Sequence, residues 1–281
     1  MSVDLHCHST VSDGGHSPSE VMAMAHANGT TMLSLTDHDH TGCLAEARAA
    51  AEGLGMRFIN GTEASITWRG RSIHIVGLNF DDQNEALLAH QAVVRSGRQE
   101  RLARISEKLA KKGIDGLYEG ALALASNPDM VGRAHMARYL MQAGHVKHMQ
   151  QAFKKYLGEG KPGYVSHDWA TLEDTVRVIT EAGGLAVIAH PGRYTVSATA
   201  LRELVGEFKA AGGVGIEVSS GSHSLNEVIN FALMADKFEL YASAGSDFHV
   251  QGEGGRKMGC PPELPKICRP IWTQFDQEGG L

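Results

Sequence analysis

The feature that most constrains the fold is an alternation of short apolar or β-branched runs with longer helix-like stretches. Such an alternation is typical of parallel strands, each joined to the next by a helix that packs on the sheet. Seven runs are expected to be strands, at residues 3–8, 31–37, 58–63, 72–77, 185–190, 214–218 and 241–245. The chain is therefore predicted to be an α/β protein, a distorted seven-stranded TIM-like barrel with an inserted helical subdomain.

Local signals refine this prediction at three places. Ser17 and Ser224 each precede a helix-like stretch and are followed three residues later by Glu20 and Glu227, the pattern of a capping box. The segment Trp68-Arg69-Gly70-Arg71 is too short for a helix and predicts a hairpin turn between the third and fourth strands.

The fourth and fifth expected strands are separated by a helix-rich stretch, residues 84–164, which is far longer than an ordinary connection. It carries 13 basic and 7 acidic side chains, 13 − 7 = +6, while the remainder carries 13 and 25, 13 − 25 = −12. We expect residues 101–164 to form a helical subdomain beside the active site of a barrel made of residues 1–100 and 165–281. An acidic body with a basic insert suits a cation site beside a polyanion site, and it does not suggest a stable duplex nucleic-acid partner.

Histidine is unusually frequent, with 15 residues against 26 Lys and Arg. Histidines and carboxylates follow successive expected strands, and the carboxyl ends of barrel strands build active sites. Imidazole with carboxylate is the ligand set of Zn, Mn and Fe. Each residue has an ordinary explanation when taken alone, such as a core histidine or a surface strand end, but their joint occurrence favours a metal site. The segments concerned are His6 to His8, Asp37 to Asp39, Glu63, His74, His190, Ser219 to His223, and Asp247 to His249.

The spacing of polar residues in the first expected strand indicates which side chains share a face. His6 and His8 are two residues apart, so both are expected to project from one face of the strand together with Asp4. Asp4 is predicted to accept a hydrogen bond from a ligand imidazole. Cys7 is predicted to point into the helix layer, away from the site.

Composition excludes several other classes of protein. No apolar run approaches the roughly 20 residues that cross a bilayer, and the first residues are not those of a signal peptide. The four cysteines form no C-x-x-C pair, so neither a disulfide framework nor a zinc ribbon is indicated. We expect a cytoplasmic protein without a membrane partner.

Several motifs together resemble the PHP (polymerase and histidinol phosphatase) family over nearly the whole barrel. Within that family the chain is most similar to the stand-alone RNase AM-like phosphoesterases, which hydrolyse nucleoside 3′,5′-bisphosphates and trim 5′-phosphorylated oligonucleotides. The basic insert also resembles that branch. The motifs are Asp4-Leu5-His6-Cys7-His8-Ser9, Ser12-Asp13-Gly14, Thr36-Asp37-His38-Asp39, Gly61-Thr62-Glu63, His74-Ile75-Val76-Gly77, Ala189-His190-Pro191 and Gly245-Ser246-Asp247-Phe248-His249.

The resemblance implies two or three divalent metal ions, with Mn expected and Fe or Zn as alternatives. It assigns His6, His8, Glu63 and Asp247 to a first metal. Glu63 would bridge to a second metal held by His74 and His190, and Asp13, His38 and His249 would hold a third. Some relatives have a histidine at the position of Asp13, a change that keeps a ligand.

Such metals lower the pKa of a bridging water and neutralise phosphoryl oxygens, so the attacking group is expected to be a metal-bridging hydroxide and no protein nucleophile is needed. His223 is the candidate general acid. Arginine suits phosphate because its guanidinium group can donate two parallel hydrogen bonds. Arg98 and Arg101, in a segment that resembles a phosphate-binding element of this branch, are candidate substrate contacts. The other candidates are Arg133, His135, Lys161 and Arg193.

Two other enzymatic functions remain open from the sequence, and a non-enzymatic one is disfavoured. A histidinol-phosphate phosphatase would share the fold and metals. A metal amidohydrolase also begins with His-x-His, but many bridge their metals with a carboxylated lysine, and no strand end here offers one. A non-enzymatic scaffold or nucleic-acid binding module predicts an incomplete ligand set or a strongly basic surface, and the sequence shows neither. The expected substrate is a small phosphorylated nucleotide such as adenosine 3′,5′-bisphosphate, or a short 5′-phosphorylated oligonucleotide. The sequence does not identify protein partners.

Overall fold

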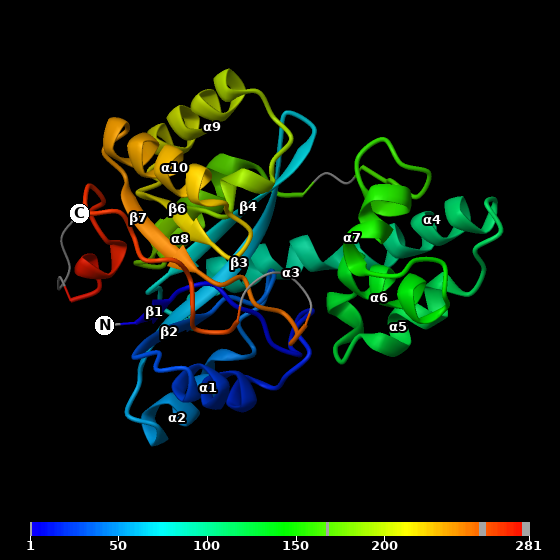
Figure 1. Cartoon of the computed structure of the whole chain (residues 1–281), viewed down its shortest axis with the longest axis horizontal. Helices are drawn as coiled ribbons and strands as arrows, with labels where there is room; N and C mark the ends of the chain where they lie inside the picture. Colours follow the sequence, from blue (N-terminus) through cyan, green and yellow to red (C-terminus); the bar gives the residue numbers. More distant parts are fainter. Residues whose placement is uncertain (1, 167–168, 253–256, 277–281) are drawn as a thin grey trace.

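The computed structural model describes residues 2–166, 169–252 and 257–276. Its strands form one seven-stranded sheet in which neighbours in sequence are also neighbours in space (Figure 1). The strands are β1 (Val3–Asp4), β2 (Met32–Leu35), β3 (Arg57–Trp68), β4 (Arg71–Leu78), β5 (Leu185–Ile188), β6 (Gly215–Ser220) and β7 (Tyr241–Gly245).

The sheet curls into a nearly closed barrel. Strand β4 is antiparallel to both of its neighbours, and the other pairs are parallel. The two ends of the sheet meet where the amide of Leu5 donates to the carbonyl oxygen of Ala244 at 2.9 Å, and where Cys7 forms a parallel bridge with Phe248. This mixed seven-stranded barrel confirms the predicted fold class.

The β3–β4 connection is a two-residue hairpin, as predicted. Trp68 pairs with Arg71, and the two residues between them have positive φ angles, 48° at Arg69 and 75° at Gly70. This is the geometry of a type I′ turn, which matches the twist of the flanking strands. Because β3 continues five residues beyond its predicted end, Glu63 lies inside the strand and not at its end.

The first strand is shorter than predicted. Residues 3–8 were expected to be extended, whereas β1 ends at Asp4 and only the bridge at Cys7 follows it. Cys7 is fully buried, and its Sγ atom lies 3.3 Å from the carbonyl oxygen of Ser34 on β2. Its predicted position away from the metal ligands is therefore confirmed.

Six helices pack around the barrel, and both predicted capping boxes are present. The Ser17 and Ser224 side chains accept from the amides of Glu20 and Glu227, whose carboxylates accept from the serine amides in return. The helices are α1 (Pro18–Ala27), α2 (Leu44–Gly53), α3 (Glu85–Ser96), α8 (Leu172–Glu181), α9 (Ala198–Ala210) and α10 (Leu225–Lys237).

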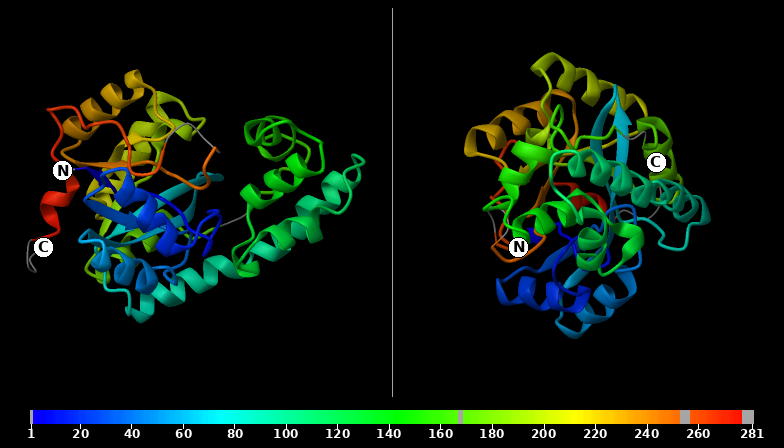
Figure 2. Two further views of the ribbon diagram at one scale, coloured as in Figure 1. Left: turned by 60° about the horizontal axis from the view of Figure 1, so that its bottom comes forward. Right: turned by 90° about the vertical axis from the view of Figure 1, so that its right-hand side faces the viewer.

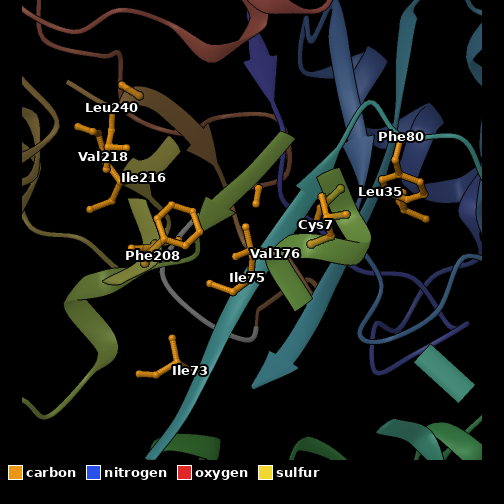
Figure 3. Close-up of a cluster of buried hydrophobic side chains, with 14 of the residues drawn as sticks. Cys7, Leu35, Ile73, Ile75, Phe80, Val176, Phe208, Ile216, Val218 and Leu240 are labelled. Atoms are coloured by element: carbon orange, nitrogen blue, oxygen red, sulfur yellow. The ribbon is translucent and has the colours of Figure 1, made fainter. Parts of the chain in front are cut away.

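Two apolar layers lie on opposite faces of the sheet. Ile75 and Ile188 belong to the cluster between sheet and helices, which includes Phe208 of α9 (Figure 3). Val76 and Val187, one residue away on the same strands, belong to a smaller cluster inside the barrel. The alternation follows from the two-residue period of a strand.

The insert has an apolar core of its own, built from residues between 102 and 165. It projects from the barrel, and α3 followed by α4 (Arg98–Ala110) leads into it (Figures 1 and 2). This separate core supports the predicted subdomain, although its boundaries at 101 and 164 stay a prediction. No helix within the described residues is long and apolar enough to cross a membrane. The longer elements of the insert are α4 (Arg98–Ala110), α5 (Leu117–Leu124), α6 (Arg133–Gln142), α7 (Met149–Ala152) and a π-helical turn (Phe153–Leu157).

Candidate metal centre

All nine predicted metal ligands come together at one end of the barrel. Strand periodicity explains two of them: Glu63 is four residues from Ile59 and His74 is two residues from Val76, so both share the face of residues that pack inside the barrel. The nine side chains form overlapping groups whose ligand atoms lie within 4.8 Å of one another. The groups are His8, Asp13, His38 and His249; His6, Glu63 and His190; His6, His8 and Asp247; and His38, Glu63 and His74.

Glu63 lies at the centre of these groups, and its two oxygens face different histidines. Oε1 lies 2.8 Å from Nδ1 of His74 and 2.8 Å from Nε2 of His190. Oε2 lies 3.3 Å from the Nε2 atoms of both His6 and His8. A carboxylate placed in this way can contact two cations at once, the arrangement expected of a bridging ligand.

Two further carboxylates complete the cluster. Asp247 Oδ1 lies 3.3 Å from Nε2 of His8. Asp13 lies 3.4 Å from Nε2 of His249 through Oδ1 and 3.8 Å from Nε2 of His38 through Oδ2. The site therefore combines imidazole with carboxylate, the ligand types that suit Zn, Mn and Fe.

Seven buried atoms of the nine ligand side chains have no hydrogen-bond partner among the described residues, and four of them are Nε2 of His6, Nε2 of His8, Nδ1 of His38 and Oε2 of Glu63. An unpartnered buried polar atom costs about 1–3 kcal/mol. All four point into the same cluster, where bound divalent cations would satisfy them. The residues present therefore fit a metal centre.

Neighbouring positive charges keep the pKa values of the buried carboxylates low, which favours the ionised form that binds metal. Burial alone would raise the pKa of Glu63, but surrounding histidines, led by His38, hold it well below its usual range. Burial also opposes the ionised form of Asp247, yet Arg193 and His6 keep its pKa well below normal. Burial would lower the pKa of His8, but Asp247 and Glu63 raise it to about 10. A metal must displace that proton, so its affinity is expected to fall as pH falls.

The backbone at the strand ends is strained. Asp39, His190 and Asp247 have φ angles of 45°, 23° and 52°. Such conformations cost non-glycine residues about 1–3 kcal/mol each and persist where the surrounding structure enforces them. Each of these residues is a predicted ligand or lies next to one.

Contacts behind the ligands differ from the prediction. Asp4 was expected to accept from a ligand imidazole, but its carboxylate accepts from the backbone amides of His6, Ser246 and Gly259. Asp4 is the last residue of β1, and its side chain faces the backbone of Ser246 and Gly259. The carboxylate beside the ring of His6 belongs to Glu217, which the sequence analysis missed. Its only signal was a lone acid within an apolar strand.

A cavity of about 840 Å³ opens between the metal cluster and the insert. Four of the six candidate substrate residues line it, namely Arg98, Arg101, Arg133 and Arg193. His135 is buried next to these residues and its Nδ1 accepts from the amide of Gly132. Lys161 is exposed and lies outside the set of cavity-lining residues.

The arginines of the insert are crowded together. Arg98 and Arg101 both place their guanidinium carbon 5.2 Å from the ring centre of Trp169, a residue that the sequence analysis did not single out. Burial, followed by the neighbouring charges of Arg133 and Arg98, lowers the pKa of Arg101 to about 9. Like charges held this close favour binding of an anion between them.

Two candidates have other partners. Arg193 forms an ion pair with the metal-ligand candidate Asp247. His223 has both ring nitrogens next to backbone: Nδ1 lies 2.9 Å from the carbonyl oxygen of Val218, and Nε2 accepts from the amide of Gly192 at 3.2 Å. This bonding counts against a general acid at His223, a role that stays a prediction.

The fold and the site define a metal-binding α/β barrel with a cationic cavity beside its metal ligands. The sequence matches the PHP domain family over residues 4–165, more than half of the chain. The chain belongs to this family, as the sequence motifs predicted.

Individual relatives match almost end to end. A 3′,5′-nucleoside bisphosphate phosphatase of Chromobacterium violaceum is 52% identical, over 98% of this chain and 96% of that protein. A 5′-3′ exoribonuclease of Haemophilus influenzae is 43% identical, over 97% and 98%. A solved structure described as an amidohydrolase from Chromobacterium violaceum, with bound sulfate and no metal, superimposes with a TM-score of 0.95 at 50% identity, over 98% of this chain and 96% of that one.

Proposed function

We propose that this protein is a metal-dependent phosphoester hydrolase that removes the 3′-phosphate from nucleoside 3′,5′-bisphosphates. The observation that carries the proposal is that one cavity is lined both by metal-ligand candidates and by the closely spaced arginines Arg98, Arg101 and Arg133. A substrate with two phosphates suits two cationic sites. The names of the Chromobacterium and Haemophilus relatives support the same chemistry.

The proposed metals are two or three divalent ions, with Mn preferred. Glu63 would be shared between a first ion, held with His6, His8 and Asp247, and a second. The second ion would also be held by His74 and His190. The third would be held by Asp13, His38 and His249. When bound, such ions activate water at neutral pH and neutralise charge on the phosphoryl group.

The protein's own residues position the substrate. Arg101 is fixed because its Nε and Nη2 atoms both donate to the carbonyl oxygen of Val165, at 3.3 and 3.1 Å. Arg98 is fixed by its ion pair with Asp39. Rigid guanidinium groups can hold one phosphate while the other reaches the metal cluster, so little entropy is lost in the reacting complex.

Trimming of short 5′-phosphorylated oligonucleotides is a second proposed activity of the same site. It is supported by the exoribonuclease name of the Haemophilus relative and by the positive charge of the insert. The four cysteines are free, which fits a cytoplasmic location, also proposed here.

The proposal is tested by phosphate release from adenosine 3′,5′-bisphosphate with Mn-loaded protein, beside 5′-AMP, histidinol phosphate and a short 5′-phosphorylated RNA. We expect 5′-AMP and phosphate as the only products from the bisphosphate. Preference for histidinol phosphate would contradict the proposed substrate and leave the metal centre standing. A panel of cyclic amides tests C–N hydrolysis, suggested by the description of the matching Chromobacterium structure. Turnover there and on no phosphoester would overturn the proposal.

Arg133→Ala is expected to raise KM for adenosine 3′,5′-bisphosphate about 10- to 100-fold, the scale of one lost charge-assisted hydrogen bond. On a plain phosphate monoester, which has no second phosphate, KM should change little. Lys155→Ala is the control because Lys155 is exposed on the same insert and outside the cavity lining. The measurement is steady-state kinetics on both substrates. An equal rise in KM on both would contradict a contact between Arg133 and the second phosphate.

A further inference from the structure

Glu217, on β6, contacts two metal-ligand candidates from behind. Its side chain is buried, with 2% of the residue exposed. Oε1 lies 3.2 Å from Nδ1 of His6, and Oε2 accepts from the backbone amide of His190 at 2.6 Å. One carboxylate thus contacts one residue from each of the two ligand sets that share Glu63.

The contact with His6 decides which ring nitrogen is free. A carboxylate only accepts hydrogen bonds, so Nδ1 of His6 must carry the proton that faces Glu217. Nε2 faces the cluster, 3.3 Å from Oε2 of Glu63 and 3.6 Å from Oδ1 of Asp247. In the neutral ring, which is the form that binds a cation, the lone pair is then on Nε2. Fixing this tautomer makes His6 competent to bind a cation.

The contact with His190 holds a strained backbone. Its φ angle of 23° is unusual for a residue with a side chain, so the conformation needs support from its surroundings. The hydrogen bond from its amide to Glu217 supplies that support. In this conformation Nε2 of His190 reaches Oε1 of Glu63 at 2.8 Å.

The neighbouring backbone leaves room for this carboxylate. A Cβ atom on Gly245, at the end of β7, would lie 2.2 Å from Cβ of His6 and 2.6 Å from Oε1 of Glu217, both too close for real atoms. The pairing of β6 with β7 also shifts register between Glu217 and Ser219. Both features lie where Glu217 meets the ligands.

We propose that Glu217 is a positioning residue of the metal centre that couples two neighbouring ion sites. It fixes the His6 tautomer on one side and the His190 backbone on the other, so both sites depend on the same carboxylate. This inference rests on the metal pair proposed above. It concerns the affinity and number of bound ions, and it assigns Glu217 no contact with substrate.

Glu217→Gln tests the inference because glutamine has the same shape but only one acceptor atom for two donors. Titration of metal-free protein with Mn²⁺ against a fluorescent chelator measures the number and affinity of bound ions. We expect the two sites that include His6 and His190 to weaken together by about 10- to 100-fold, the usual loss for a residue that orients a ligand. Glu207→Gln is the matched control: its carboxylate contacts Trp68 and Arg69, away from the site, and wild-type affinity is expected.

Further measurements separate a positioning role of Glu217 from a general packing defect. Turnover of Glu217→Gln should be restored by excess Mn²⁺ with KM for the bisphosphate unchanged, whereas a general packing defect would not respond to metal. Glu217→Asp keeps the charge but shortens the reach, and it should also weaken both sites; it serves as the test if the glutamine variant does not fold. Wild-type stoichiometry and affinity in a folded variant would overturn the inference and leave the proposed function intact. Absence of Mn²⁺ binding by the wild-type protein would instead overturn the proposed metal centre.

Discussion

The Glu63→Gln variant is expected to lose turnover of adenosine 3′,5′-bisphosphate by about 10³-fold or more, the scale on which a preorganised charge contributes to catalysis. Both oxygens of Glu63 are engaged, Oε1 with His74 and His190 and Oε2 with His6 and His8. Glutamine removes the negative charge and replaces one oxygen with an amide nitrogen, which cannot bind a cation. The shared position between two ions is then lost.

The measurement is kcat and bound Mn²⁺ in the same preparation. We expect the variant to lose metal as well as activity, because the carboxylate offsets the charge of the ions in a buried site. Glu203→Gln, which removes only an exposed ion pair with Arg69, should retain both. A Glu63→Gln protein that turns over at a near-normal rate when metal is saturating would rule out a bridged pair.

Much of the barrel could be predicted because its signals are local. The capping boxes at Ser17 and Ser224 and the hairpin at Arg69-Gly70 depend only on neighbouring residues, and all three are present. Strand ends were less predictable. Strand β3 continues to Trp68 because its partner β4 supplies hydrogen bonds along the hairpin, and that pairing is a property of the fold. Strand β1 ends earlier than predicted, at Asp4.

The ligand cluster could be predicted because its side chains follow the order of the strands and match the PHP motifs. The residues behind it could not. Glu217 reaches His6 across 211 positions, and nothing near it in sequence indicates that contact. Likewise the hydroxyl of Tyr194, which accepts from the amide of His74 at 3.0 Å, is 120 positions away from its partner. Asp4 was predicted instead because, two residues from His6, it would share a strand face with that ring.

The order of the polypeptide also explains how the insert meets the metal centre. Asp39 directly follows the ligand candidate His38, and its carboxylate forms a buried ion pair with Arg98 at the start of α4. Its backbone oxygen accepts from Arg95 of α3 at 2.6 Å. Asp39, next to a candidate metal ligand, therefore binds side chains from both helices that lead into the basic insert. The position of the candidate substrate contact Arg98 is thereby tied to the position of the metal ligands.

Loss of the ion pair between Asp39 and Arg98 should destabilise the folded protein. Asp39→Asn is expected to lower the free energy of unfolding by about 3 kcal/mol, the lower end of the range for removing one partner of a buried ion pair. Asp39 and Arg98 are 1% and 8% exposed, so water could not solvate the charge of Arg98 well once its partner is removed. Asparagine tolerates the φ angle of 45° at this position and keeps an acceptor for the amide of Ser65, which donates to Asp39 at 2.7 Å, so the change isolates the charge.

Chemical denaturation of metal-free protein measures this loss without interference from bound ions. Asp82→Asn is the matched control, because its ion pair with Arg48 is partly exposed, with 48% of the Arg48 and 20% of the Asp82 side chain accessible, and should contribute at most about 1 kcal/mol. Combining Asp39→Asn with Arg98→Met should restore part of the lost stability, since no uncompensated buried charge then remains. If Asp39→Asn is no more destabilising than Asp82→Asn, the pair does not anchor the insert, and Arg98 is held at the cavity by Trp169 instead.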